Sequence, residues 1–178
     1  MTLPVHIRPA KPSESGFISD AWLRSFRDFS GCEKEMYHEI YRPIIDGCIK
    51  HCTTMVIAHN SDPDQLYGFV NFICDEFGAV VNYLYVKATF RKMGFANFLL
   101  ARTGCKPWSV ATFTTPVARK CFEATEFVYA PTLCVYAAYG DHKHPVFRSC
   151  VNLASRLRTR EKNSSNAQGL SGVDDVRG

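Results

Sequence analysis

The segment from Val80 to Ala96 holds the residues of this chain that are best suited to chemistry. A strand-forming run leads into a basic turn that contains Gly94 and opens a helix. A helix start offers unpaired backbone N–H groups and the positive end of the helix dipole, and both suit a pyrophosphate. Gly94 lets the backbone approach a ligand, Ala96 keeps the next turn small, and Arg91 and Lys92 add positive charge.

Two other phosphate-binding patterns do not fit this turn. The glycines do not have the spacing of a G-x-G-x-x-G dinucleotide motif, and the turn lacks the G-x-x-x-x-G-K-[ST] pattern of a P-loop. NAD and ATP are therefore disfavoured as ligands.

We predict no metal site. Cys48, His51, Cys52 and His59 form the one cluster with ligand-like residue types, but it lacks a second well-spaced ligand pair. The eight cysteines are scattered through apolar patterns rather than grouped as a disulfide framework. We expect most of them to be buried thiols in a reducing compartment.

Hydrophobic periodicity predicts the elements that position the Val80–Ala96 segment. Apolar residues between Phe17 and Phe29, and again between Met36 and Cys52, recur on one face of a helix, and Pro43 should kink the second helix. Alternation and turn signals predict six strands and two further helices. The strands are Val5–Arg8, Thr53–His59, Leu66–Cys74, Ala79–Val86, residues 107–113 and Thr132–Tyr139; the helices cover residues 94–103 and run from Thr115 and Pro116 to about Ala124.

This order of elements predicts an α/β (α+β) fold in which helices flank a central mixed sheet. Antiparallel hairpins should come early in the chain and a crossover connection later. If the edge of the Thr132–Tyr139 strand is free, two copies of the chain could pair there as a homodimer.

Length and charge indicate how the chain is divided into a folded domain and a tail. The 178 residues, 46% of them hydrophobic, suit one domain over residues 1–150. Residues 151–178 hold five Lys or Arg against three Asp or Glu, which leaves +2 of the net +4 for residues 1–150. We expect a flexible basic tail and a nearly neutral body, which argues against nucleic acid as a partner. No apolar run is long enough for a membrane span or a signal peptide, so we expect a soluble cytoplasmic protein.

The motif Arg91-x-x-Gly94-x-Ala96, which follows Leu84-Tyr85-Val86, resembles the acetyl-CoA pyrophosphate motif of the GNAT superfamily of N-acetyltransferases. The order of the elements and the opening Ile7-Arg8-Pro9-Ala10 agree with this resemblance, which covers roughly residues 5–139. The segments Ala21–Arg27 and Tyr83–Lys87 further resemble uncharacterised members carried by bacteriophages.

The resemblance implies a splayed pair of parallel strands, residues 80–86 and 107–113, that hold acetyl-CoA. Backbone groups of Leu84, Tyr85 and Val86 would bind the pantetheine arm and polarise the thioester carbonyl. The pyrophosphate would lie on Arg91, Lys92, Met93, Gly94, Phe95 and Ala96. Thr115, Ala118 and Phe122 match the spacing of the second helix that faces the cofactor, where the family usually has Asn, Ala and Tyr.

Two positions depart from the catalytic pattern that the resemblance implies. Asn82 stands where many GNAT enzymes have a Glu base, and Phe122 stands where many have a Tyr that protonates the CoA thiolate. Tyr83, Tyr85 and Asn82 are the catalytic candidates that remain on the strand, with Asp75, Glu76 and Cys121 as further substitutes. Strand alternation predicts that the two tyrosines share one face and that Asn82 lies on the other. Packing of the tyrosines against a helix is an equally good interpretation.

These residues leave two main hypotheses and a weaker third. The leading one is an acetyl-CoA-dependent N-acetyltransferase in which an amine attacks the thioester directly in a ternary complex. The acceptor is left open among a protein N-terminus, a lysine side chain and a small amine. The alternative is a catalytically weak or inactive binding module that keeps the CoA cleft and acts through a protein partner. The third is binding of nucleic acid or an acidic partner by the tail around Arg156, Arg158 and Arg160.

Overall fold

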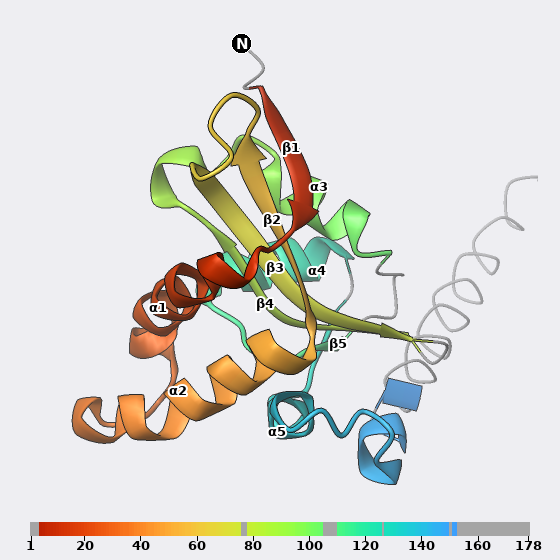
Figure 1. Ribbon diagram of the computed structural model, residues 1–178. Coiled ribbons are helices and arrows are strands. Elements are labelled where there is room, and N and C mark those ends of the chain that lie inside the picture. Colours follow the sequence, from red (N-terminus) through yellow and green to blue (C-terminus); the bar gives the residue numbers. More distant parts are fainter. Residues whose placement is uncertain (1–3, 76–77, 105–109, 126, 150, 153–178) are drawn as a thin grey trace, which may run out of the picture.

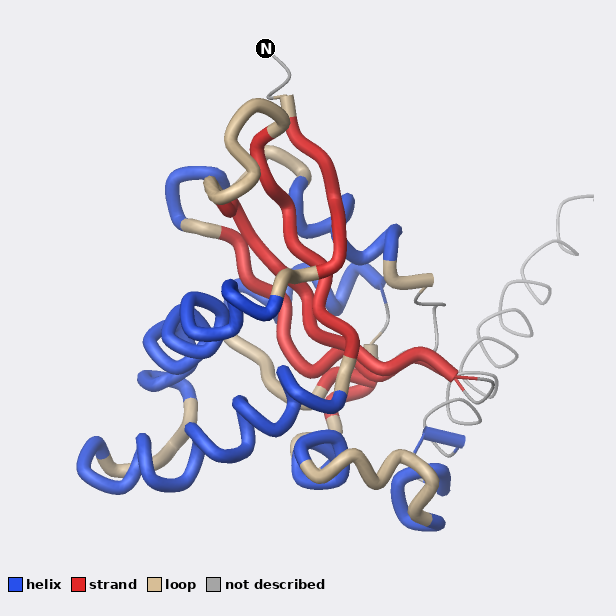
Figure 2. The backbone as a smooth tube through the Cα atoms, in the orientation of Figure 1, coloured by secondary structure: helices blue, strands red, loops and turns tan. Residues whose placement is uncertain are grey.

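Six strands form one mixed sheet in the order β1-β2-β3-β4-β5-β6 (Figures 1 and 2). This computed structural model describes residues 4–75, 78–104, 110–125, 127–149 and 151–152. The strands are β1 (Val5–Pro9), β2 (Thr53–His59), β3 (Leu66–Asp75), β4 (Gly78–Val86), β5 (Val110–Ala111) and β6 (Val128–Tyr129). The helices are α1 (Ser15–Phe26), α2 (Lys34–His51), α3 (Phe95–Arg102), α4 (Pro116–Thr125) and α5 (Leu133–Ala138), with 3₁₀ turns η1 (Pro12–Glu14), η2 (Arg27–Phe29) and η3 (Ala88–Phe90).

The sheet changes from antiparallel to parallel at β4. The strands β1 to β4 pair antiparallel with their neighbours, whereas β5 and β6 pair parallel and are reached through α3 and α4. Parallel neighbours require such a crossover. The predicted fold class, a mixed sheet flanked by helices with hairpins first and crossovers later, is confirmed.

Two helical layers cover the two faces of the sheet (Figure 1). The face beneath α1, α2 and α5 buries an aromatic core that includes Trp22, Tyr83 and Phe113. The opposite face packs against α3 and α4 through Phe95, Leu99 and Ala118. The strands β2 to β5 therefore send side chains into two separate apolar cores.

The last predicted strand, Thr132–Tyr139, is wrong. Residues Leu133–Ala138 form the helix α5, and the sixth strand is instead Val128–Tyr129. The buried residues Leu133, Ala137 and Ala138 follow helical spacing, and α5 packs on α2. The contact is close because Gly47 of α2 has no side chain: a Cβ there would lie 2.5 Å from the carbonyl oxygen of Ala138. The proposed dimer contact through a strand at residues 132–139 therefore loses its basis.

The other element predictions agree with the structure to within a few residues where it describes them. The helix α2 continues through Pro43, and Thr115 caps α4, since its Oγ1 accepts the N–H of Ala118 at 3.2 Å. Residues 107–109 of the predicted fifth strand and residues 153–178 of the predicted tail lie outside the described residues.

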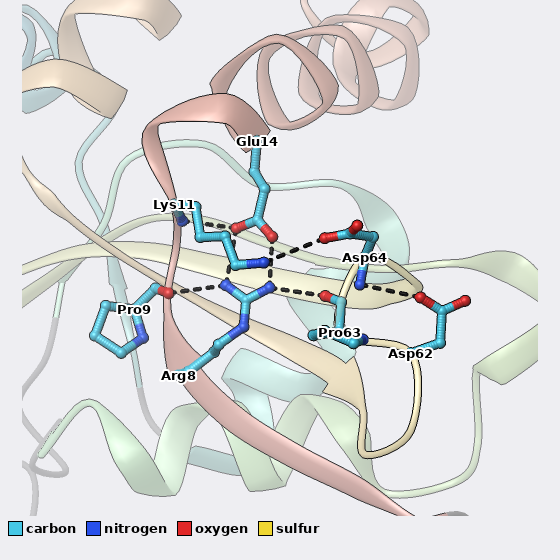
Figure 3. Close-up of polar contacts among 7 residues, drawn as sticks. All are labelled: Arg8, Pro9, Lys11, Glu14, Asp62, Pro63 and Asp64. Atoms are coloured by element: carbon cyan, nitrogen blue, oxygen red, sulfur yellow. Dashed lines mark hydrogen bonds and ion pairs between the residues drawn. The ribbon is translucent and has the colours of Figure 1, made fainter.

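A polar cluster joins the start of the chain to the loop between β2 and β3 (Figure 3). Both Nη atoms of Arg8 donate to the carboxylate of Glu14, and Nη2 also donates to the carbonyl of Pro63 at 2.8 Å. The backbone N–H of Lys11 donates to Glu14 at 2.7 Å, and the Lys11 ammonium pairs with Asp64 at 3.2 Å. The cluster fixes the entry of α1 relative to the sheet.

Within the described residues, no helix combines the length and the apolar character that crossing a membrane would require.

Candidate functional site

A cavity of about 400 Å³ lies where β4 ends and α3 begins. Its walls come from four parts of the chain: the second half of β4, the loop into α3, the start of α4, and the end of α1 with η2. The described lining residues are Ser25, Phe29, Tyr83, Leu84, Tyr85, Val86, Phe90, Arg91, Lys92, Gly94, Phe95, Ala96, Asn97, Thr115, Val117 and Ala118. Every residue predicted to bind the cofactor is among them except Met93, which lies in the same loop.

The cavity opens because β4 and β5 part. Their pairing consists of Val80 with Val110 and Val81 with Ala111. Two further bonds, Thr112 N–H to Val81 O and Phe113 N–H to Asn82 O, both 3.1 Å, extend it by one step. Beyond Asn82, no pairing between the two strands occurs in the described residues. The edge of β4 from Tyr83 to Val86 therefore faces the cavity.

The loop at one end of the cavity presents a row of free backbone donors. The N–H groups of residues 92–97 have no hydrogen-bond acceptor within the described part of the chain. Lys92 and Gly94 have positive φ angles of 66° and 81°, and α3 begins directly afterwards. Successive N–H groups in such a turn form a concave anion site, which the dipole of α3 reinforces.

Positive charge is concentrated in the sequence segment that contains this loop. Residues 78–122 contain seven Lys or Arg and no Asp or Glu, whereas residues 1–77 contain seven Lys or Arg and eleven Asp or Glu. Arg91 and Lys92 line the cavity, and Arg119 and Lys120 lie exposed on the first turns of α4. None of these four has a salt bridge to an acid among the described residues. The prediction of a nearly neutral body therefore missed a segregation of charge that cancels in the total.

Tyr83 and Ser25 line the cavity together. Tyr83 is 2% exposed, its ring stacks on Trp22 with centroids 4.8 Å apart, and its hydroxyl lies 2.8 Å from Ser25 Oγ. Ser25 donates its single proton to the carbonyl of Ala21 at 2.6 Å, so Tyr83 is the donor to Ser25. Burial raises the pKa of Tyr83 to about 12, and the hydroxyl stays protonated at neutral pH.

Asn82 lies on the same face as Tyr83, so the prediction that it faces the other way is wrong. The register between β3 and β4 shifts at Asn71 and Phe72: Asn71 pairs with Tyr83 and Phe72 with Val81, which leaves Asn82 as an extra residue in a bulge. Its side chain is fully buried, donates to Asn71 Oδ1 at 2.7 Å, and does not line the cavity.

Of the remaining predicted residues, Tyr85 and Arg91 lie at the cavity, whereas the side chains of four others lie outside what the structure describes. Tyr85 is half-buried at the cavity and packs near Phe69, with ring centroids 5.4 Å apart. The side chain of Arg91 turns back, and its Nε donates to the carbonyl of Val86 at 3.2 Å. Nothing is described for the side chains of Asp75, Cys121 and Phe122, or for Glu76.

Sequence reasoning missed the contribution of α1 and η2 to the cavity. Ser25 and Phe29 line it, and Phe29 is 48% exposed at its rim. The helical spacing of the apolar residues up to Phe29 predicted only a face that packs on the core. No local signal in the sequence marks Ser25 as a cavity residue. The positive charge of the segment that contains Arg119 and Lys120 could have been predicted, because the sequence shows a long run without acidic residues there.

The described cavity lining contains no Asp, Glu or His. Within the described part of the chain, no three His, Cys, Asp or Glu side chains converge as metal ligands. The groups that the described cavity lining offers for chemistry are therefore backbone donors, cations and hydroxyl groups.

The fold is that of GNAT acetyltransferases. A GCN5-related N-acetyltransferase from Ralstonia eutropha superposes with a TM-score of 0.52 at 12% identity over 69% of this chain and 92% of that one. A protein assigned as an acetyl transferase from Pyrococcus furiosus gives a TM-score of 0.51 at 16% identity over 67% and 91%. At these identities the likeness shows the fold alone.

Another similar structure is the GNAT family N-acetyltransferase YhbS from Escherichia coli, solved in complex with CoA. It shares 21% identity over 58% of this chain and 56% of that one, with a TM-score of 0.40. This chain thus spans little more than half of that protein. No protein-family model and no curated protein matches the sequence.

Proposed function

We propose that this protein is an acetyl-CoA-dependent N-acetyltransferase, in which an amine attacks the thioester directly in a ternary complex. The observation that carries the proposal is the row of free N–H groups at residues 92–97, set between cations at the head of a cavity beside the parted strand β4. The GNAT fold supports it. The resemblance to bacteriophage-carried members is a finer prediction that rests on sequence alone.

The two ends of the cavity match the two ends of acetyl-CoA. The residues 92–97 would hold the pyrophosphate through backbone N–H groups, and Arg91 and Lys92 would offset its charge. Arg119 and Lys120, exposed on α4, would attract the remaining phosphate. The pantetheine arm would run along the free edge of β4 from Val86 toward Tyr83, a distance of about 10 Å for three residues. The thioester would therefore lie near the hydroxyl groups of Tyr83 and Ser25.

The chemistry at that end follows from the groups present. The neutral amine forms a bond to the thioester carbonyl carbon, and backbone N–H groups of β4 stabilise the negative charge on its oxygen. The carbon–sulfur bond then breaks, the thiolate takes the proton of the Tyr83 hydroxyl, and the new amide's excess proton returns to Tyr83. No side-chain base lines the described cavity. The amine would therefore bind in its neutral form or lose its proton to water.

One observation favours the alternative of a binding module that keeps the CoA cleft. Asn82 cannot accept a proton as a carboxylate does, and its side chain is buried away from the cavity. A protein of this kind would bind CoA and act through a protein partner, with slow turnover or none.

Turnover separates the two functions. The full chain is incubated with acetyl-CoA and, in turn, a peptide with a free N-terminus, a lysine peptide blocked at its N-terminus, and a small diamine, and release of the CoA thiol is followed. The proposed function predicts acetylation of one class at roughly 1 per second or faster. Binding of CoA with no acetylated product from any amine would support the binding module instead.

A further inference from the structure

Four buried polar side chains form a ladder that runs across β2, β3 and β4 to the residue that follows β5. Asn71 Nδ2 donates to Thr54 Oγ1 at 2.9 Å, Asn82 Nδ2 donates to Asn71 Oδ1 at 2.7 Å, and Thr112 Oγ1 donates to Asn82 Oδ1 at 3.2 Å. Asn71 and Asn82 are fully buried, and Thr112 is 2% exposed. Polar groups buried this deeply are costly unless every one is paired.

The ladder crosses the sheet at the point where β4 and β5 part. Asn82 is the extra residue of the β4 bulge, and its carbonyl accepts the N–H of Phe113 in the last described bond between the two strands. Its side chain joins β3 on one side to the residue that follows β5 on the other. A bulge bends the strand that carries it and redirects the residues that follow. In this chain those residues begin with Tyr83 and continue along the cavity.

The hydrogen-bond directions require an amide at position 82. Both N–H groups of Asn71 are used, one on Thr54 and the other on the carbonyl of Cys48 at 3.2 Å, so Asn71 Oδ1 can only accept. Position 82 must therefore donate toward β3 while it accepts from Thr112, the residue that follows β5. An ionised carboxylate would face the Asn71 oxygen with no proton to offer. An apolar side chain would leave Asn71 Oδ1 without its donor and would leave Thr112 only the backbone carbonyl of residue 82, which its Oγ1 approaches at 3.4 Å.

We propose that Asn82 is a positioning residue: through the ladder it fixes where β4 leaves β5 and so aligns the edge of β4 that binds the acyl donor. This inference rests on the proposed function for the identity of the donor. It differs from the view that Asn82 occupies a catalytic position that has lost its carboxylate. On that second view, a carboxylate at position 82 would restore a base and raise turnover.

The test compares Asn82→Asp, Asn82→Leu and Tyr37→Phe with the wild type. Tyr37 is a matched control, since it is fully buried and donates to the carbonyl of Leu23 at 2.8 Å but lies outside the ladder and the cavity. Folding is checked by circular dichroism, and CoA affinity by calorimetry. We expect both Asn82 variants to bind CoA about tenfold more weakly at pH 8, and Tyr37→Phe to bind it within twofold of the wild type.

The aspartate variant should also acquire a pH dependence. A protonated carboxyl can donate to Asn71 and accept from Thr112, so CoA affinity of Asn82→Asp should recover toward pH 5, whereas that of Asn82→Leu should not. The titratable groups packed nearby are the Cys48 thiol of α2 and the Tyr83 hydroxyl of β4. A hydrogen bond with Cys52, together with burial, raises the pKa of Cys48, burial raises that of Tyr83, and both groups stay neutral over this range. Faster acetyl transfer by Asn82→Asp, or wild-type CoA affinity in folded Asn82→Leu, would overturn the proposal.

A second readout does not depend on CoA. Hydrogen exchange at the Phe113 amide, which donates to Asn82 O, reports on the parting point itself. Thr112→Val removes only the hydrogen bond from Thr112 Oγ1 to Asn82, and it can be used for this measurement if the Asn82 variants fail to fold. We expect it to speed exchange of the Phe113 amide at least severalfold, whereas Tyr37→Phe should leave this exchange rate unchanged. Unchanged exchange in Thr112→Val would overturn the ladder's role, whereas a wild type that binds no CoA but keeps this difference would refute only the proposed function.

Discussion

Tyr83 and Asn82 are neighbours on β4, yet their surroundings give them different tasks. Tyr83 lines the cavity and its hydroxyl has Ser25 as its partner, whereas the Asn82 amide has protein partners on both sides and Asn82 does not line the cavity. Alternation along a regular strand predicts opposite faces for the two residues, and the bulge at Asn82 removes that alternation. A bulge depends on how two strands pair, so the sequence of β4 alone does not predict it.

Replacing Tyr83 with Phe tests the hydroxyl at the thioester end. We expect kcat to fall by about 10² or more, because the leaving thiolate loses its proton donor, while the affinity for CoA stays within about threefold. The measurement pairs CoA release with calorimetry, and Tyr37→Phe controls for the loss of a buried hydroxyl. An unchanged kcat in Tyr83→Phe would contradict a catalytic role for this residue.

At the scale of elements, the sequence predicted what local periodicity determines. The β2–β3–β4 hairpins, α2 through Pro43, and the strand that leads into the Gly94 turn and α3 all carry clear periods or caps. The segment Thr132–Tyr139 does not, since its alternating Leu, Val and aromatic residues also satisfy a short helix. Packing against Gly47 of α2 decides in favour of the helix, and that contact spans some ninety residues of chain. The contribution of α1 to the cavity likewise depends on tertiary packing, which local periodicity does not predict.

Gly47→Ala tests how closely α5 packs on α2. Its Cβ would meet the Ala138 carbonyl, so we expect the free energy of unfolding to fall by about 1–3 kcal/mol despite the better helix propensity of Ala. Urea unfolding measures the change. Gly16→Ala in α1, where an added Cβ meets nothing within 4 Å, should be neutral or stabilising by up to about 1 kcal/mol. Equal effects at both positions would contradict the close approach.

The Arg8–Glu14 pair should make stability depend on pH. The hydrogen bond from Arg8 holds the pKa of Glu14 below its ordinary value of 4.5. A carboxyl whose pKa is lowered by folding stabilises the fold fully above pH 4.5 and loses that contribution as pH falls through the folded pKa. Glu14→Gln should therefore cost about 1–3 kcal/mol at pH 7 and much less at pH 3. Urea unfolding at the two pH values checks this, and an equal cost at both would refute the pair's role.

For the whole molecule, the separation of charge matters more than its sum. The segment 78–122 carries +7, while residues 1–77 carry −4, and two cations of the first segment, Arg91 and Lys92, line the cavity at its proposed phosphate end. Long-range attraction should thus raise the affinity for an anionic donor in a salt-dependent way. A net charge of +4 alone does not reveal this arrangement.

Charge reversal on α4 tests the electrostatic part. The pair Arg119→Glu and Lys120→Glu should weaken CoA binding about tenfold at low salt, and less at 0.5 M salt because the charges are screened. The pair Arg24→Glu and Lys34→Glu makes the same change in charge on α1 and α2 and should alter affinity by no more than about twofold. Equal losses from the two pairs would mean that net charge, and not its placement, governs binding.

Calorimetric titration of the full chain with acetyl-CoA shows whether this cavity holds the proposed cofactor. We expect one-to-one binding by the wild type. We also expect at least a tenfold loss of affinity in the Arg91→Ala, Gly94→Glu variant, which removes a cation and places an acidic side chain at the left-handed turn before α3. Absence of binding by the wild type, or equal affinity in the folded variant, would contradict the assignment of this cavity to acetyl-CoA.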